Sequence, residues 1–245
     1  MQNYRMLIQY NGTKFSGWQK QGNTDNTIQG KIENVLSRMV EEEVEIIGAG
    51  RTDAGVHAKG QVASFVLPIP MDTVEIHNYL CRYLPKSIAV LRVDKVKSGF
   101  HARFNAILKT YEYRIWNSVI PNVFEEPFMY TCTDEINVDK MRKALVYLIG
   151  EQDFRAFCTR ISKNKSSVRT IQGISIEKIG DEIRFTYSAN GFLYNMIRIM
   201  TGTLLEVGVG RLKPEDVKDI LLSKDRKKAG LTLPGKGLTL LNIKY

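Results

Sequence analysis

The sequence predicts an α+β fold of two similar halves, each a mainly antiparallel sheet with helices packed on one face. Two observations lead to this prediction. Short segments of alternating polar and apolar residues are separated by longer segments with apolar residues every three to four positions. The order in the first half is β-α-β-β-α-β, and the second half mirrors it without repeating its sequence. We place the halves at residues 1–105 and 106–245 and expect an active-site cleft between them.

The first half is expected to contain two helices among its strands. A helix that begins near Thr27 repeats apolar residues on one face and follows residue types that cap helices. The second helix, at 71–84, carries Val74, Leu80 and Leu84 as its apolar residues. The strands are expected at 4–10, 44–49, 61–67 and 88–97.

The second half is expected to begin with a strand at 109–117, whose polar and apolar residues alternate. A helix follows at 138–149, with Asn137 as its cap. The pair Gly180-Asp181 separates two alternating segments and is typical of a two-residue hairpin turn. The remaining predicted elements are helices at 193–206 and 214–223 and a last strand at 239–245.

The charge of the chain favours a polyanionic partner. There are 35 Lys and Arg residues against 26 Asp and Glu, a net charge of +9, which is typical of proteins that bind nucleic acid. The segment 155–172 has basic residues and no acidic one. Such a segment either contacts RNA phosphates or is simply a solvated face. Its basic residues are Arg155, Arg160, Lys163, Lys165 and Arg169.

Several classes of protein are not expected. No apolar run reaches the roughly 18 residues of a membrane span, and the N-terminus lacks the apolar core of a signal peptide. We therefore expect a cytoplasmic protein without a membrane partner. The cysteines Cys81, Cys132 and Cys158 are far apart and form no CxxC pair, so neither a disulfide framework nor a zinc site is predicted.

One glycine-rich stretch concentrates charged side chains. Residues 48–65, GAGRTDAGVHAKGQVASF, carry Arg51, Asp53 and His57 among four glycines. A dinucleotide-binding turn is excluded because Asp53 stands where the third glycine of that motif belongs, and a metal site lacks a third ligand. Asp53 either completes a tight turn by bonding to its own backbone or serves as a nucleophile or base beside a cation.

This stretch resembles the catalytic motif of the TruA family of tRNA pseudouridine synthases. Further segments, in the same order as in that family, extend the resemblance over nearly the whole chain: YNGTKFSGWQKQ, FHARFNAILKTYEYRI, GFLYNMIRIMTGTLLEVG and AGLTLPGKGLTLLNIKY. One departure is LTLPGKGL, where the family has a run rich in proline and alanine.

The resemblance implies a reaction and its partners. A uridine in the anticodon stem-loop of tRNA is detached from its ribose, turned and rejoined through C5 as pseudouridine, with no cofactor and no metal. The protein is implied to be a homodimer that binds tRNA. The family's catalytic aspartate corresponds to Asp53, which must be ionised whether it adds to the base, attacks the sugar or removes a sugar proton. The glycines around it are then interpreted as backbone freedom for close approach to a flipped nucleotide.

The resemblance also implies roles for other residues. Arg51 corresponds to the arginine that displaces the flipped base. Tyr111 corresponds to the tyrosine that stacks on uracil, and it is a candidate to take the C5 proton. Arg198 corresponds to the cation that keeps the aspartate ionised. From the residues alone, Tyr111 also fits a packed strand, and Arg198 on its apolar helix also fits an ion pair with Glu206. Further candidates for contact with RNA are His57, His101 and Arg103.

A second hypothesis is a non-catalytic RNA-binding protein or RNA chaperone that uses the same basic surface. Asp53 distinguishes the two hypotheses. A pure binder should bind RNA better after Asp53→Asn, because a negative charge facing phosphates is removed. The enzyme should keep its binding and lose its turnover.

Overall fold

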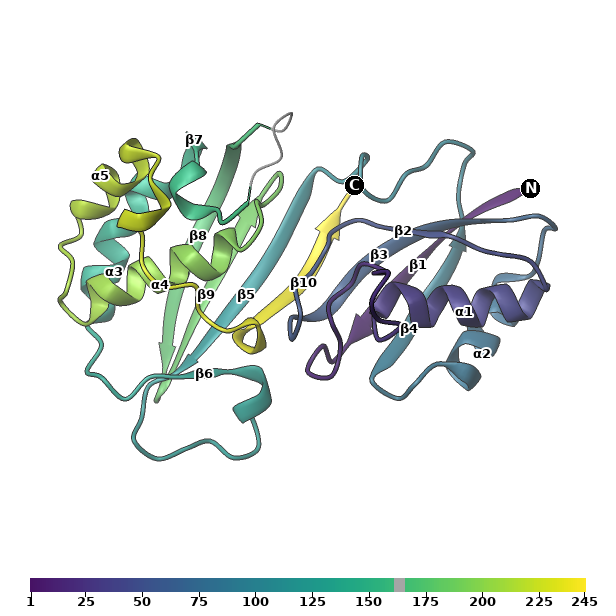
Figure 1. Ribbon diagram of the computed structural model, residues 1–245, viewed down its shortest axis with the longest axis horizontal. Helices are drawn as coiled ribbons and strands as arrows, with labels where there is room; N and C mark the ends of the chain where they lie inside the picture. The colour runs from purple at the N-terminus through teal and green to yellow at the C-terminus, as the bar shows by residue number, and fades with distance from the viewer. Residues whose placement is uncertain (161–165) are drawn as a thin grey trace. The chain divides into compact units, whose positions relative to one another are not determined.

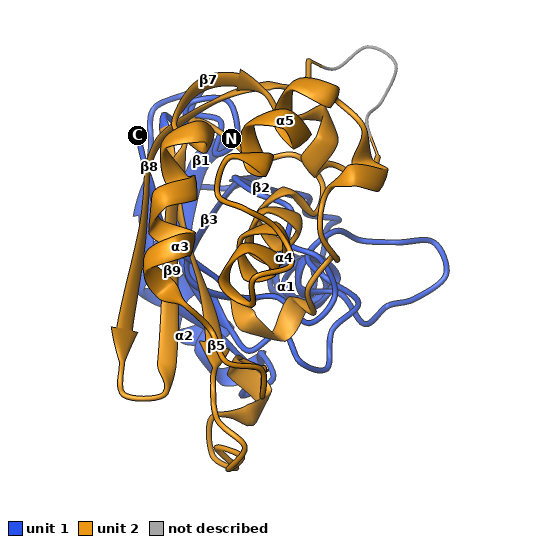
Figure 2. Ribbon diagram, turned by 90° about the vertical axis from the view of Figure 1, so that its left-hand side faces the viewer, with its two compact units in different colours: residues 1–107, 239–245 blue, residues 108–238 orange. Residues whose placement is uncertain are grey.

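The computed structural model describes residues 1–160 and 166–245. They group into two compact units: residues 1–107 with 239–245 are unit 1, and residues 108–238 are unit 2 (Figures 1 and 2). The sequence-based division assigns the last strand to the second half. In the structure this strand belongs to unit 1, because β10 (Leu238–Lys244) pairs in parallel with β3 (His57–Leu67).

Unit 1 is a mainly antiparallel sheet with two helices. Its strand order is β4-β1-β3-β10, and the short β2 pairs with β3. The central β1 runs antiparallel to both β3 and β4. The elements follow the predicted β-α-β-β-α-β order and are β1 (Gln2–Tyr10), α1 (Ile28–Val40), β2 (Ile46–Gly48), β3, α2 (Thr73–Tyr83) and β4 (Ile88–Lys95).

Each helix of unit 1 buries one face. Thr27 caps α1 by accepting a hydrogen bond from a backbone N–H in the first turn. The apolar face expected for α2 needs one correction, since Val74 is 62% exposed while Ile76 is fully buried. Ile76, Leu80 and Leu84 are spaced four residues apart and share the inner face, whereas Val74 lies on the outer one.

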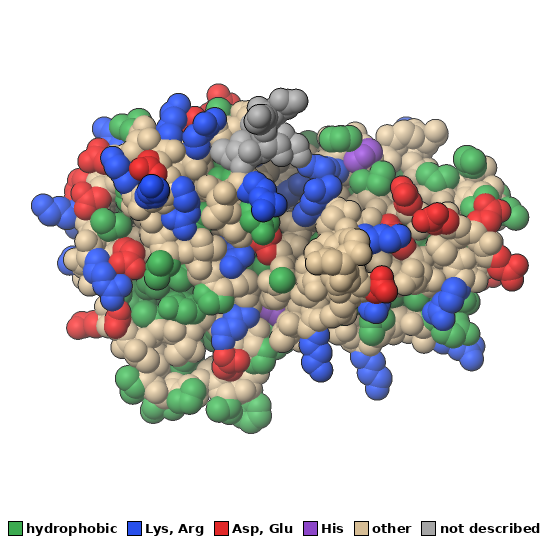
Figure 3. Space-filling view, viewed as in Figure 1, with side chains coloured by type: hydrophobic (Ala, Val, Ile, Leu, Met, Phe, Trp, Pro, Cys, Tyr) green, Lys and Arg blue, Asp and Glu red, His purple; other side chains and the backbone are tan. Residues whose placement is uncertain are grey.

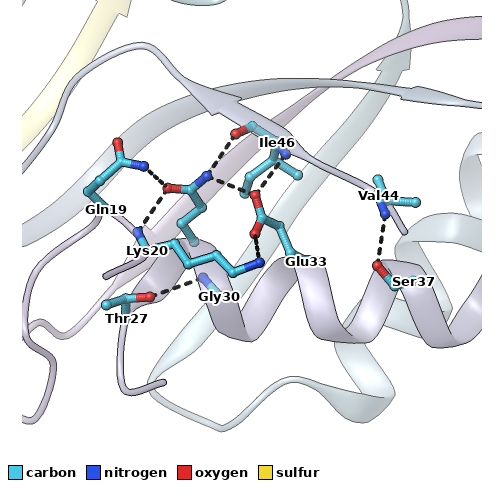
Figure 4. Close-up of polar contacts among 9 residues, drawn as sticks. Gln19, Lys20, Thr27, Gly30, Glu33, Ser37, Val44 and Ile46 are labelled. Carbon is cyan, nitrogen blue, oxygen red and sulfur yellow. Dashed lines mark hydrogen bonds and ion pairs between the residues drawn. The ribbon is translucent and has the colours of Figure 1, made fainter. Parts of the chain in front are cut away.

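The polar side of α1 ties the helix to β2 and to the chain before it (Figure 4). Glu33 is only 4% exposed, and its carboxylate accepts hydrogen bonds from Ile46 N at 3.1 Å and Gln29 Nε2 at 2.7 Å. Gln29 Oε1 in turn accepts from Lys20 N at 3.0 Å. These bonds satisfy a buried charge and fix β2, which leads directly into the glycine-rich stretch.

Unit 2 is a mainly antiparallel sheet with its helices on one face (Figure 2). Its strand order is β5-β9-β8-β7, and the short β6 pairs with β5. The predicted hairpin is confirmed, since Ile179 pairs with Glu182 across a turn in which Gly180 has a φ of +59°. The elements are β5 (Leu108–Trp116), β6 (Tyr130–Thr131), α3 (Val138–Ala144), β7 (Gly150–Asp153), β8 (Val168–Ile179), β9 (Glu182–Ala189), α4 (Met196–Gly208) and α5 (Asp216–Ser223).

Two helices of unit 2 differ from their predicted bounds. The helix expected at 138–149 is α-helical only to Ala144 and tightens to a 3-10 turn over Leu145–Leu148. Its predicted cap, Asn137, is confirmed. The next helix, α4, begins later than predicted because Asn195 adopts a left-handed conformation with a φ of +62°. Asparagine tolerates this conformation better than most residues. With these adjustments, the predicted α+β class with two similar halves is confirmed.

Candidate active site

Residues 49–56, between β2 and β3, form a loop that we call the Asp53 loop. Arg51 is exposed and Asp53 is half-buried, whereas Thr52 between them is buried. The turn that follows is closed by Gly55, whose φ of +76° is a conformation that favours glycine. The loop therefore anchors one side chain in the protein and keeps its two charged neighbours accessible.

A buried hydrogen-bond network lies beneath the Asp53 loop. The hydroxyls of Tyr10 and Thr52 are 2.8 Å apart. Gln61 Oε1 accepts from Gly50 N at 3.3 Å, and Gln61 Nε2 donates to Gly50 O at 2.7 Å. Burial raises the pKa of Tyr10 well above its ordinary value, although hydrogen bonds with Thr52 and Gln61 oppose this. Neutral groups thus fix the backbone immediately before Asp53.

Two glycines of the stretch serve packing within unit 1. A Cβ on Gly48 would lie 2.5 Å from the Trp18 ring, and a Cβ on Gly60 would lie 2.3 Å from Leu241 O. Neither position can accept a side chain unless its neighbours move. The interpretation of these glycines as freedom to approach a nucleotide is therefore corrected: Gly48 makes room for Trp18, and Gly60 makes room for β10.

His57 supports the far end of the Asp53 loop. It is the first residue of β3 and is only 3% exposed. Its Nδ1 accepts a hydrogen bond from Gly12 N at 3.0 Å, which places the proton of a neutral ring on Nε2. This position favours a supporting role for His57 over the contact with RNA expected from the sequence.

His101 and Arg103 lie together in the turn that follows β4. His101 Nδ1 accepts from Arg103 N and Phe104 N, each at 3.2 Å, so the imidazole closes the turn. The Phe104 ring is 77% exposed, and the guanidinium carbon of Arg103 is 6.0 Å from its centroid. The turn thus presents to solvent a cation beside an aromatic ring, two groups that bind unpaired nucleotides.

In unit 2, Arg198 lies in the first turn of α4 and is half-buried. Its Nε donates to Leu233 O at 2.6 Å, and its Nη1 donates to Asn195 Oδ1 at 2.7 Å. Asn195 is held in turn by Thr159, whose Oγ1 accepts from Asn195 Nδ2 at 2.9 Å. These two acceptors orient the guanidinium.

Two tyrosines of β5 share one face of the sheet. Tyr111 is 6% exposed, and the Phe192 ring stands edge-on to it with centroids 5.3 Å apart. Tyr113 is fully buried, and its hydroxyl donates to Pro234 O at 2.8 Å. Burial raises the pKa of Tyr113, while the charge of Arg198 opposes the increase. Tyr113 is therefore a neutral donor close to Arg198.

The basic segment 155–172 contains side chains in different surroundings. Arg155 and Arg160 are exposed. Arg169 is half-buried; its Nη1 donates to two backbone carbonyls at 2.9 and 2.6 Å, and burial lowers its pKa. On the face shown in Figure 3, basic side chains occur over both units with acidic ones among them. Two predicted residues of this segment lie outside the described residues: Lys163 and Lys165.

Some supporting groups could not be found from the sequence. Asn195 precedes Arg198 by one helical turn, a spacing that offers a signal for their contact. The contact with the Leu233 carbonyl leaves no signal in the sequence, because every residue has a backbone carbonyl. The acid considered as a partner of Arg198, Glu206, instead pairs with Arg211 at 3.2 Å.

Neither a metal centre nor a membrane segment is found in the described part of the chain. Among residues 1–160 and 166–245, no group of three His, Cys, Asp or Glu side chains is placed to hold a metal ion. In the same residues, no helix has the length and apolar character needed to cross a membrane.

Comparison with known proteins connects these features to a family. A sequence model of the family described as tRNA pseudouridine synthase matches residues 6–105 and 144–245. The chain is 47% identical over 245 residues to tRNA pseudouridine synthase A of Bacillus sp. (strain KSM-64), with all of both chains covered. It is 43% identical over 245 residues to tRNA pseudouridine synthase A 2 of Bacillus thuringiensis subsp. konkukian (strain 97-27), again with all of both chains covered.

A third relative covers the whole chain, whereas the structural match is distant. The tRNA pseudouridine synthase A of Brevibacillus brevis is 44% identical over 247 aligned positions, with all of both chains covered. A chain in the crystal structure of a Cbf5–Nop10–Gar1 complex has a TM-score of 0.39 and 12% identity, covering 96% of this chain and 57% of that one. The whole-length relatives therefore carry the assignment.

Proposed function

The chain belongs to the tRNA pseudouridine synthase family, and we propose that Asp53 is the carboxylate with which it isomerises uridine to pseudouridine in tRNA. The observation that carries this proposal is the Asp53 loop. It keeps a carboxylate and the Arg51 cation accessible on either side of Thr52, which the buried network beneath it holds in place. The alternative of a non-catalytic RNA-binding protein is not favoured by the family match.

The reaction needs an ionised carboxylate, since each of its three possible routes begins with attack or proton removal by Asp53. An accessible cation at Arg51 favours the charged form of a neighbouring carboxylate. The base must also leave the RNA stack, which costs a few kcal/mol. We assign to Arg51 the displacement of that base, because its side chain is exposed and precedes Asp53 by two residues.

Unit 2 supplies two further residues to the proposed reaction. Tyr111 stacks on the uracil, an interaction worth about 1–3 kcal/mol for an aromatic ring and a base; its edge contact with Phe192 supports a fixed ring. Arg198 supplies the positive charge that favours the ionised aspartate. Its guanidinium is oriented by Leu233 O and Asn195 Oδ1.

We propose that RNA phosphates contact the exposed basic residues Arg103, Arg155 and Arg160, with Lys163 and Lys165 in the same segment as the last two. Arg169, bound to backbone carbonyls, is a weaker candidate. Phosphate contacts release counterions, so the logarithm of the binding constant should fall with the logarithm of the salt concentration. Arg155→Gln should reduce that slope by about one; an unchanged slope would remove Arg155 from the interface.

We also propose the modified region of the tRNA, the place of action and the oligomeric state. The resemblance supports the anticodon stem-loop as the modified region, the cytoplasm as the place of action and a homodimer as the active form. A surface for the second copy is offered by the loop after β5, whose exposed apolar side chains are Val119, Ile120, Val123 and Phe124, between 70 and 87% exposed. Sedimentation velocity tests this: the dimer should dissociate in Phe124→Asp, and a monomeric wild type would contradict it.

The experiment that tests the function is tritium release. Unmodified tRNA whose uridines carry tritium at C5 is incubated with purified protein, without metal or cofactor, because the new bond at C5 expels that hydrogen. Wild type should release tritium, whereas Asp53→Asn should bind tRNA with similar affinity and release none. Equal release from both proteins would show that another residue is the catalytic carboxylate. Tight binding without release by wild type would support the RNA-binding alternative.

A further inference from the structure

Residues 229–234, AGLTLP, form a segment that we call the strap, which follows the 3-10 turn Arg226–Lys228 and lies against α4. Its backbone contacts the helix closely: a Cβ on Gly202 of α4 would lie only 2.0 Å from Leu231 O. Gly230 N donates to Thr203 Oγ1 at 2.9 Å. The strap is therefore fixed against the middle of α4, one turn beyond Arg198.

The strap positions two side chains through its backbone oxygens. Leu233 O accepts from Arg198 Nε at 2.6 Å, and Leu233 N donates to Arg198 O at 3.4 Å. The next carbonyl, Pro234 O, accepts from the Tyr113 hydroxyl at 2.8 Å. A small shift of the strap would therefore move the guanidinium of Arg198, because its Nε bond is both short and directional.

Arg226 binds the strap at its first residue and again at Thr232. Its Nη1 donates to Ala229 O at 3.2 Å, and its Nη2 donates to Thr232 Oγ1 at 2.9 Å. The side chain is half-buried, and burial lowers its pKa. Within the described residues, its buried Nε has no hydrogen-bond partner.

Such an arrangement is poorly suited to stability alone. A cation removed from water is unfavourable unless it is paired and fully hydrogen-bonded, and the two acceptors that Arg226 meets among the described residues are neutral. An apolar side chain could fill the same space without that cost. The two diverging Nη bonds, however, need a planar guanidinium, which lysine cannot replace.

We propose that Arg226 is a positioning residue: through the strap it fixes the orientation of Arg198 for the isomerisation. The inference deepens the proposed function and rests on it. It predicts that loss of Arg226 lowers the rate of the chemical step and leaves the affinity for tRNA unchanged. A phosphate contact by Arg226 would produce the reverse, weaker binding at an unchanged rate.

The test measures kcat and KM by tritium release and Kd by filter binding for Arg226→Met, which keeps an apolar stem and removes both Nη donors. We expect kcat to fall roughly 10- to 100-fold, as small displacements of catalytic groups do, with KM and Kd within about two-fold of wild type. Arg226→Lys should retain little of the wild-type kcat, because lysine lacks the planar guanidinium. Lys218→Met, which removes one charge from an exposed position on α5, is the matched control and should leave kcat unchanged.

A double-mutant cycle shows whether Arg226 acts through Arg198. In an Arg198→Lys background, Arg226→Met should cost less than about three-fold, because the group that it positions is already altered. If Arg226→Met lowered kcat as much in the Arg198→Lys background as in wild type, the inference would be overturned. A wild-type kcat for a folded Arg226→Met protein would also overturn it. If Arg226→Met fails to fold, Thr232→Val tests the inference instead, because it removes only the hydroxyl that accepts from Arg226. Thr232→Val should also lower kcat. An unchanged kcat in this variant would overturn the inference.

Failure of this inference can be told apart from failure of the proposed function. If Asp53→Asn abolishes tritium release and Arg226→Met leaves kcat unchanged, only the positioning role is wrong. If Asp53→Asn releases tritium at the wild-type rate, the proposed function is wrong whatever Arg226 does.

Discussion

Asp53 and Arg198 are held by different means, one in each unit. The Asp53 loop is fixed from below by neutral side chains, with Tyr10 bound to Thr52 and Gln61 bound to Gly50. Arg198 is fixed by the backbone of the strap and by Asn195. A loop that carries charges of both signs next to each other needs only a rigid base. The guanidinium of Arg198, on a helix, is oriented by a backbone oxygen and a side-chain amide oxygen.

The largest expected effects come from adding a Cβ at two glycines that lie against a neighbouring backbone, one glycine in each unit. A Cβ on Gly12 would lie 2.0 Å from Val56 O under the Asp53 loop, and a Cβ on Gly202 would lie 2.0 Å from Leu231 O under the strap. Gly12→Ala and Gly202→Ala should each lower the free energy of unfolding by about 1–3 kcal/mol. Each should also lower kcat, because the backbone that holds a proposed catalytic side chain must move.

Hydrogen exchange followed by mass spectrometry separates the two regions. Gly12→Ala should speed exchange in peptides from 46–61 and not in those from 196–208, and Gly202→Ala should do the opposite. Gly22→Ala and Gly173→Ala are the controls, because a Cβ on either glycine meets no atom within 4 Å. If each substitution loosened both regions equally, the two supports would not be independent.

Acid should loosen unit 2 while leaving the base of the Asp53 loop intact. Burial tends to raise the pKa of Glu182, but hydrogen bonds from Arg184 and Arg114 and the charges of both lower it to about 2. Its carboxylate lies 2.6 Å from Arg114 Nε and is 10% exposed. Because the folded pKa is the lower one, this stabilisation is complete above the ordinary glutamate pKa and is lost as the pH falls toward 2. The loss should be on the order of 2 kcal/mol.

The acid prediction can be checked with the two tryptophans, Trp18 in unit 1 and Trp116 in unit 2. Urea unfolding followed by fluorescence, in Trp18→Phe and Trp116→Phe proteins, should show acid sensitivity between about pH 4.5 and pH 2 for the Trp116 signal. Glu182→Gln should remove most of that sensitivity. An equal response of Trp116 fluorescence with and without Glu182 would assign the acid effect to other carboxylates.

The sequence predicted the elements better than the contacts between them. Hydrophobic spacing located α1 and the hairpin around Gly180, because both depend on local pattern. It misplaced Val74, since one apolar residue at a helix end fits two faces, and it could not assign the last strand, whose pairing with β3 joins residues far apart in the chain. Among the site residues, the resemblance named Asp53 and Arg198. Their supports were not predictable where backbone atoms supply them.

The smallest expected effect comes from a matched pair of buried tyrosine hydroxyls. Tyr10 bonds to Thr52 and Tyr187 bonds to Thr201, both at 2.8 Å, and burial raises the pKa of both tyrosines. Tyr10→Phe and Tyr187→Phe should therefore each lower the free energy of unfolding by about 1 kcal/mol. Only Tyr10→Phe should also lower kcat, by up to roughly ten-fold, because Thr52 adjoins Asp53. Equal kcat values for two equally stable variants would show that the network under the Asp53 loop supports the fold and not the reaction.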